Sequence, residues 1–333
     1  MKVAEMFAGA GGLALGLEKA GFKNICCLEI DKWATKTLKK NRGDWKIIED
    51  DIAVFVDNFS KYNFPEIDLL SGGFPCQSFS YAGKKAGFQD KRGETFHHFA
   101  KLIDIWKPKS FLIENVRGLI SHQKGKTFKN IIKILESKGY KVYWKVLNAW
   151  NYGVSQKRER VFIVGFKQSL LGDNFQFSFP KEHEYKPNLR DALKGVPSSE
   201  GAEYPQSKKK VLDLIPMGGC WRDLPEEIAR EYMKKSYFLG GGKTGMARRI
   251  SWEEPSLALT TSPQQKQTER CHPEETRPFA VREYARIQSF PDNWEFTGSM
   301  LNKYKQIGNA VPVNLAKEVG IAIKKTLSSI SNE

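Results

Sequence analysis

The residue of this chain with the clearest chemical potential is Cys76. It follows an apolar run at residues 67–71, inside the glycine-rich turn at residues 72–80. A structural cysteine would lie within the apolar run, whereas Cys76 lies just beyond its carboxyl end, where open α/β sheets build their sites. This position predicts a nucleophile. The alternative is a loop cysteine without a chemical role.

A second functional group, Glu114, emerges after another apolar run at residues 111–113. A carboxyl group that leaves an apolar strand can hold a proton near neutral pH, because burial disfavours its charged form. Farther along the chain, Arg158 and Arg160 precede a further predicted strand. A guanidinium group can hold a carboxylate or a phosphate with two hydrogen bonds. The alternative for these arginines is a solvated charge run.

A glycine-rich segment at residues 7–12, Phe-Ala-Gly-Ala-Gly-Gly, follows the first predicted strand and opens a helix. Glycines at such a junction let a ligand approach the backbone closely, and the helix N-terminus favours negative groups. The spacing departs from the dinucleotide pattern G-x-G-x-x-G, because Leu15 stands where the third glycine belongs. A nicotinamide-dependent dehydrogenase is therefore disfavoured.

Two acidic residues follow the next two predicted strands. Glu29 ends the second strand, where doubly wound folds hydrogen-bond a ribose diol, and Asp51 follows the third strand, as an acceptor suited to an adenine amino group. Together with Phe7 these residues predict a pocket for an adenosyl ligand. Either acid alone would more often be a solvated loop carboxylate.

The elements that position these residues alternate between β-rich runs and helical patterns. This alternation predicts a doubly wound, mainly parallel, seven-stranded sheet with helices on both faces. Helices are expected at residues 94–106 and 127–138, the latter with apolar residues at i, i+3, i+4 and i+7. The expected strands are residues 2–7, 24–30, 45–48, 67–71, 110–114, 141–147 and 160–166.

The composition indicates the partner and the compartment. In 333 residues, 53 Lys and Arg against 38 Asp and Glu give a net charge of +15, which favours a polyanionic partner such as nucleic acid. Five sparse cysteines without a C-x-x-C pair favour neither a disulfide framework nor a metal site, so we expect no metal and a reducing, cytoplasmic location. No membrane span or secretion signal is recognised.

Taken together, six segments in this order resemble the DNA (cytosine-5)-methyltransferase family of prokaryotic restriction-modification systems. They cover the chain except for about residues 172–276. The segments are Phe-Ala-Gly-Ala-Gly-Gly at 7–12, Pro-Cys-Gln at 75–77, Glu-Asn-Val at 114–116, Gln-Lys-Arg-Glu-Arg at 156–160, Arg-Glu-Tyr-Ala-Arg-Ile-Gln at 282–288 and Gly-Asn-Ala-Val-Pro at 308–312.

The resemblance implies a catalytic role for three residues. Cys76 would attack C6 of a cytosine flipped out of double-stranded DNA, Glu114 would hold and protonate N3, and Arg160 would orient Glu114. C5 would then take a methyl group from S-adenosyl-L-methionine, leaving S-adenosyl-L-homocysteine. The cofactor-binding residues so implied are Phe7, Ala8, Gly9, Gly11, Gly12, Glu29, Ile30, Asp51, Ile52, Pro75 and Asn309. Asp50 stands where many members of the family have glycine, which blurs the choice of Asp51 for adenine.

The same resemblance divides the chain into three parts. Residues 1–171 would form the catalytic and cofactor-binding domain, residues 172–276 the target-recognition domain, and residues 277–333 a hinge segment and a helix that returns to the first domain. The loop at residues 78–93 would close over DNA. The implied DNA-binding residues are Ser80, Arg158, Arg248 and Arg249.

We therefore expect a monomeric enzyme that acts on the nucleoid and protects host DNA from a partner restriction endonuclease. Two rivals stay open on the sequence alone. One is an RNA cytosine-5 methyltransferase with the same catalytic set, and the other is a catalytically silent DNA-binding protein on the same fold.

Overall fold

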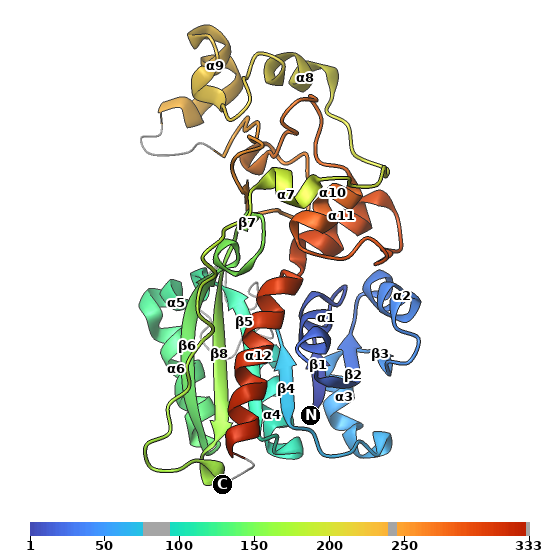
Figure 1. The fold of residues 1–333 in the computed structure, drawn as a ribbon, viewed down its shortest axis with the longest axis vertical. Coiled ribbons are helices and arrows are strands. Elements are labelled where there is room, and N and C mark those ends of the chain that lie inside the picture. The colour runs from blue at the N-terminus through green and yellow to red at the C-terminus, as the bar shows by residue number, and fades with distance from the viewer. Residues whose placement is uncertain (76–93, 239–244, 331–333) are drawn as a thin grey trace. The chain divides into compact units, whose positions relative to one another are not determined.

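The computed structural model describes residues 1–75, 94–238 and 245–330 (Figure 1). The chain forms two compact units. The first consists of Met1–Asn148, Glu159–Glu182 and Val313–Glu333, and the second consists of Ala149–Arg158 and His183–Pro312. The second unit therefore takes in residues 149–158 and 277–312, which the sequence analysis assigned to the catalytic domain and to the returning segment.

A seven-stranded sheet organises the first unit, and it confirms the predicted fold class. The strand order is β3-β2-β1-β4-β5-β8-β6, in which β8 runs antiparallel to β5 and β6 and the other pairs are parallel. The order reverses at β1 and β4, and open α/β sheets bind ligands outside the carboxyl ends of the strands at such a point. The strands are β1 (Lys2–Met6), β2 (Lys23–Glu29), β3 (Ile47–Glu49), β4 (Leu69–Gly72), β5 (Ser110–Val116), β6 (Tyr140–Asn148) and β8 (Glu159–Lys167).

Helices cover both faces of this sheet. On one face, side chains of α3, α4 and α6 share an apolar core with alternate strand residues such as Met6, Phe111 and Ile163. Elsewhere in the unit α1 packs against α12, where a Cβ added to Gly16 would lie 2.3 Å from the Cβ of Ala316 (Figure 1). The α-helices of the first unit are α1 (Gly12–Lys19), α2 (Lys32–Asn41), α3 (Ile52–Asp57), α4 (Glu94–Trp106), α5 (Gly118–Ser121), α6 (Lys126–Ser137) and α12 (Val313–Ile330).

The second unit is less regular. It has a small apolar core that includes Leu212, Ile215 and Cys271, and buried arginines cross-link its loops. Two short strands, β7 (Gln156–Lys157) and β9 (Ser256–Leu257), pair in parallel. Its α-helices are α7 (Leu189–Leu193), α8 (Gln206–Leu212), α9 (Glu226–Met233), α10 (Val281–Ile287) and α11 (Met300–Asn309).

Candidate active site

Two of the predicted site residues, Cys76 and Ser80, lie outside the described residues, as does the loop at 78–93. The chain can be followed from the end of β4 at Gly72 as far as Pro75. There the carbonyl oxygen of Phe74, a buried residue, accepts a hydrogen bond of 3.0 Å from the Nδ2 atom of Asn115 on β5. This bond ties the segment that leads to Cys76 to the strand that carries Glu114.

Glu114 and Arg160 lie on neighbouring strands and form an ion pair. β5 and β8 run antiparallel with Val116 opposite Arg160, and the Nε atom of Arg160 lies 2.9 Å from Oε1 of Glu114. The two side chains are 15% and 12% exposed. Both side chains are therefore largely shielded from water. The sequence analysis placed Glu114 as the last residue of this strand, and β5 continues two residues further, to Val116.

Gly73 brings the backbone of the turn against this pair. A Cβ atom added at Gly73 would lie 2.9 Å from Oε2 of Glu114, which is closer than real Cβ contacts. Only glycine therefore fits at this position without moving the carboxyl group. The sequence contains the signal, a glycine three residues before Cys76, but the neighbour it makes room for appears only in the structure.

The cofactor side is built around the loop between β1 and α1. Phe7 has a φ of 57°, and Gly9 and Gly11 have φ values of 53° and 88°. Such a φ is strained for phenylalanine and often marks a functional site. The Gly9 amide donates to Oε2 of Glu29 at 2.7 Å, and the Asp31 amide donates to Oε1 at 2.8 Å. Glu29 therefore fixes the loop at the carboxyl edge of the sheet.

Burial raises the pKa of the Glu29 carboxyl, and the backbone N–H groups of Asp31 and Gly9 oppose this shift. Next to it, Ile30 is 64% exposed, an unusual position for a large apolar side chain beside a polar loop. An exposed apolar side chain at this edge can pack on a flat ring. The arrangement thus offers a hydrogen-bond acceptor and an apolar surface side by side.

Asp51 is exposed and caps α3, because its carboxylate accepts a hydrogen bond of 2.7 Å from the Ala53 amide. Asp50 in turn accepts a hydrogen bond from the Asp51 amide at 2.8 Å. Ile52 is buried in the apolar core of the first unit. Asn309 is exposed at the end of α11 in the second unit.

The three arginines that the resemblance assigned to DNA have protein partners in the structure. Arg158 is 2% exposed and donates to the carbonyl oxygens of Leu259, Gly308 and Ala310. Arg248 donates to the carbonyl of Gly218, and its NH2 group lies 2.6 Å from both carboxylate oxygens of Glu254.

Arg249 is also buried, and it donates to the carbonyl oxygens of Leu212, Ile215 and His272. A phosphate contact would cost each of these arginines hydrogen bonds that it already makes within the second unit. The DNA-binding role expected of Arg158, Arg248 and Arg249 stays a prediction, and a phosphate contact would have to replace these hydrogen bonds.

One carboxyl group that the sequence analysis missed is Glu5 on β1. It is almost fully buried, lies 3.5 Å from the hydroxyl of Ser71, and accepts a hydrogen bond from the backbone of Ala14 in α1. Burial raises its pKa well above the ordinary value, which favours the neutral acid. The signal in the sequence is an acidic residue within an apolar strand, directly before the glycine-rich loop.

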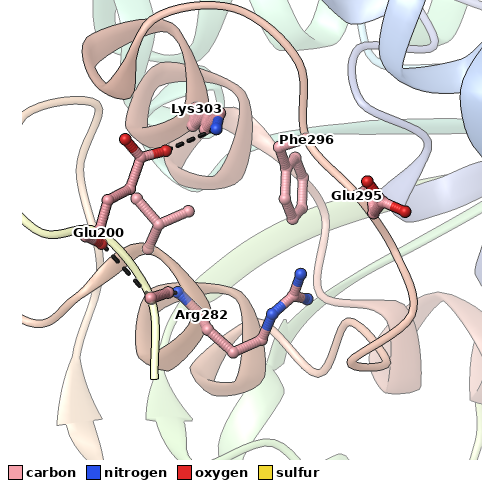
Figure 2. Close-up of a pocket in the computed structure, with 7 residues that line it drawn as sticks. Glu200, Arg282, Glu295, Phe296 and Lys303 are labelled. Carbon is pink, nitrogen blue, oxygen red and sulfur yellow. Dashed lines mark hydrogen bonds and ion pairs between the residues drawn. The ribbon is translucent and has the colours of Figure 1, made fainter. Parts of the chain in front are cut away.

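A pocket of about 320 Å³ in the second unit is lined by residues that include Glu200, Arg282 and Lys303 (Figure 2). Its cationic groups are engaged: Lys303 pairs with Glu200 at 2.5 Å, and Arg282 donates to the carbonyls of Pro291 and Trp294. Among the residues that the structure describes, no cluster of three His, Cys, Asp or Glu side chains could hold a metal ion. Within those same ranges, no helix is long and apolar enough to cross a membrane.

Solved structures share this architecture over their whole length. An Escherichia coli prophage protein described as a DNA modification methyltransferase has a TM-score of 0.71 and 25% sequence identity, and the comparison covers all of both chains. A DNMT2 from Spodoptera frugiperda has a TM-score of 0.68 at 17% identity and covers 100% of this chain and 99% of its own, which supports the fold alone. The fold is that of the S-adenosyl-L-methionine-dependent methyltransferases.

The sequence comparisons narrow this class to a family. The model described as C-5 cytosine-specific DNA methylase matches residues 1–325. The chain is 56% identical over 330 residues to the type II methyltransferase M.Sau96I of Staphylococcus aureus, covering 99% of this chain and 77% of that one. It is 54% identical over 337 residues to M.Eco47II of Escherichia coli, covering 99% and 80%. The chain therefore belongs to the C-5 cytosine-specific DNA methylases and is an enzyme that methylates cytosine in DNA.

Proposed function

We propose that the enzyme methylates C5 of a cytosine flipped out of duplex DNA, through a transient covalent bond between Cys76 and C6. The observation that supports this proposal most is the placement of Glu114, which Arg160 holds at 2.9 Å and which lies against Gly73. Because Gly73 precedes Cys76 by three residues, a single short segment would bring the thiol to the carboxyl group.

In the proposed reaction the thiolate of Cys76 adds to C6 while Glu114 gives a proton to N3. The electrons of the C5–C6 double bond then move toward C4, so that C5 becomes an enamine-like nucleophile. S-adenosyl-L-methionine, when bound, supplies the methyl group that C5 attacks. A solvent base then takes the C5 proton, the C5–C6 double bond re-forms as the thiolate leaves, and N3 returns its proton to Glu114, which restores the enzyme to its starting state.

Arg160 would act through Glu114 in this scheme. A guanidinium group at 2.9 Å fixes one carboxyl oxygen and leaves the other to face the base. Proton transfer by a positioned carboxyl group raises a reaction rate by about 10²–10⁴-fold. This requires the carboxyl group to lie within hydrogen-bond distance of the atom that it protonates. The ion pair thus supplies orientation, which an isolated glutamate on an open edge would lack.

The residues of the first unit fit the cofactor. Each oxygen of Glu29 accepts one backbone N–H group and has a further lone pair that can accept a ribose hydroxyl. Gly9 and Gly11 leave the loop open to close approach, and Ile30 offers an apolar surface to the adenine ring. We assign further contacts to Phe7, Ala8, Gly12, Asp51, Ile52 and Pro75 of the first unit, and one to Asn309 of the second unit.

We further propose that the second unit selects the DNA sequence, with Ser80 as a DNA contact at the catalytic loop. The type II relatives support a role in protecting host DNA from a partner restriction endonuclease. The enzyme would then act as a monomer on the nucleoid, in the cytoplasm of a prokaryotic cell. Its reaction needs no metal, because every proposed step uses a side chain or the methyl donor.

The test is transfer of labelled methyl groups to duplex DNA, followed by bisulfite sequencing of the product. The wild-type protein should methylate one cytosine within one short sequence, and Cys76→Ala should abolish transfer. Cys220→Ala, which removes a buried thiol from the second unit, is the matched control and should keep the activity. Wild-type label on tRNA instead of DNA, or full turnover by Cys76→Ala, would overturn the proposal.

A further inference from the structure

Arg158 is a buried cation in the second unit whose guanidinium group donates hydrogen bonds to backbone carbonyl oxygens. Its NH1 group donates to the carbonyl of Leu259 at 2.9 Å, and its NH2 group donates to the carbonyls of Gly308 and Ala310 at 2.7 and 3.2 Å. The guanidinium is therefore directed at backbone oxygens, and two of these belong to the residues on either side of Asn309. A phosphate-binding arginine would need the same donors for its ligand.

Gln288 also binds the backbone of the turn that carries Asn309. Its side-chain amide donates to the carbonyls of Ile307 at 2.7 Å and Ala310 at 3.2 Å, and it accepts a hydrogen bond from the amide of Gln156 at 2.8 Å. Both glutamines are fully buried. Three segments that lie far apart in the sequence thus converge on the turn that carries Asn309.

The turn is also fixed from its other side, by close packing at Gly308. A Cβ atom added there would lie 2.2 Å from the carbonyl oxygen of Thr260, which is sterically impossible without backbone movement. The same oxygen accepts a hydrogen bond of 2.8 Å from the hydroxyl of Tyr284. Asn309 itself is exposed. Its neighbours are held by buried hydrogen bonds while its side chain is left to solvent.

We propose that Arg158 is a positioning residue for the cofactor site: it fixes Asn309 by binding the carbonyls of Gly308 and Ala310, and it does not contact DNA phosphate. This inference rests on the proposed function, in which Asn309 meets S-adenosyl-L-methionine. The planar guanidinium group of arginine can donate hydrogen bonds to several carbonyl oxygens at once, whereas the ammonium group of lysine is a compact point charge. Charge alone is therefore insufficient at this position.

The two roles predict opposite results for Arg158→Lys. A positioning role predicts that the Kd for S-adenosyl-L-homocysteine, measured by calorimetry, rises about tenfold, and that the KM for the methyl donor rises while kcat stays within about twofold. The slope of log K against log salt for duplex DNA should stay unchanged, because no phosphate contact is lost. A phosphate contact would instead leave cofactor affinity intact, and Arg158→Gln would make the slope shallower by about 0.9.

A double-mutant cycle shows whether Arg158 acts through Asn309. Asn309→Ala and Arg158→Lys should each weaken cofactor binding, and the double variant should be no weaker than the worse single variant. Additive losses would overturn the proposal. Should Arg158→Lys fail to fold, Gly308→Ala takes its place in the cycle, because it displaces the same turn without changing a charge.

Arg249→Lys is the matched control. It removes a comparable set of hydrogen bonds to buried carbonyls in the second unit, at Leu212, Ile215 and His272, and leaves the turn at Asn309 untouched. It should lower the melting temperature like Arg158→Lys but keep the cofactor Kd within about twofold of wild type. A wild-type protein without methyl transfer would refute the proposed function, whereas normal wild-type activity with additive losses would refute only the role of Arg158.

Discussion

The replacement of Gly73 by alanine tests the geometry of the catalytic pair most sharply. The φ of Gly73 lies outside the left-handed region, so alanine adds a steric contact without straining the backbone. The new Cβ would lie 2.9 Å from Oε2 of Glu114 and 3.4 Å from its carbonyl oxygen. The carboxyl group must therefore withdraw, against the ion pair that holds it to Arg160.

The size of the effect follows from this distance. Restoring an ordinary contact of 3.4 Å or more requires the carboxyl oxygen to move by roughly half an ångström. A displacement of about 1 Å can cost about 100-fold in rate, so the expected loss in the single-turnover rate of methyl transfer is about tenfold. Binding of DNA and of the cofactor should change little, because the contact involves neither.

Gly72→Ala is the control from the adjacent residue. Its Cβ would lie 2.7 Å from the carbonyl oxygen of Met6 and 3.1 Å from the ring of Phe99, which belong to the core. This variant should lose about 1–3 kcal/mol of stability in urea unfolding, with the rate per folded molecule preserved. A wild-type rate for Gly73→Ala, or equal rate losses in both variants, would refute the account of Gly73.

Further predictions concern buried charges. Arg160→Lys should lower kcat by about 100-fold with little change in KM for DNA, measured by steady-state kinetics, because lysine cannot orient Glu114 through the same fork. Because the pKa of Glu5 is raised in the fold, the native state binds more protons than the unfolded chain, so stability should fall as pH rises above about 4.5. Melting temperatures should show that Glu5→Gln removes this fall, and an unchanged pH dependence would contradict it. Arg249→Ala should lose about 3 kcal/mol or more in urea unfolding, because three buried carbonyls lose their donor; a normal midpoint would show that these hydrogen bonds do not stabilise the second unit.

Much of the first unit could be predicted because its strands are local patterns. The expected strands at 2–7, 24–30 and 110–114 correspond to Lys2–Met6, Lys23–Glu29 and Ser110–Val116. The helix expected at 127–138 is Lys126–Ser137. A continuous apolar run predicts a buried parallel strand, and Gly or Pro ends it. The two-residue strand β7 was missed, because so short a segment has no periodicity.

The burial and hydrogen-bond partners of the arginines could not be predicted from the sequence, because they depend on residues that lie far apart in the chain. Arg158 binds carbonyls that lie 101 to 152 residues away in the sequence, and neither its charge nor its neighbours in the chain indicate burial. The sequence pattern marks Arg158 and Arg160 alike. The fold directs one toward Glu114 and buries the other among backbone oxygens of the second unit.

Gly308 is a second residue whose structural role depends on a neighbour that the sequence does not reveal. Its place in the segment 308–312 marks it as part of a motif, but the reason for glycine is the carbonyl of Thr260, 2.2 Å from the position of the missing Cβ. Likewise, the boundaries of the second unit follow packing and not composition, so it includes regular helices such as Val281–Ile287 that the sequence pattern does not separate from the first unit.

The most direct test of the central claim is the intact mass of the protein after reaction with duplex DNA that carries 5-fluorocytosine at the target position. Fluorine cannot leave C5 as a proton does, so the reaction should stop at a covalent adduct that contains one added methyl group. The proposal predicts this adduct for the wild type, attached at Cys76, and none for Cys76→Ala. An adduct at another residue, or methylation of ordinary DNA without any adduct to the fluorinated strand, would contradict it.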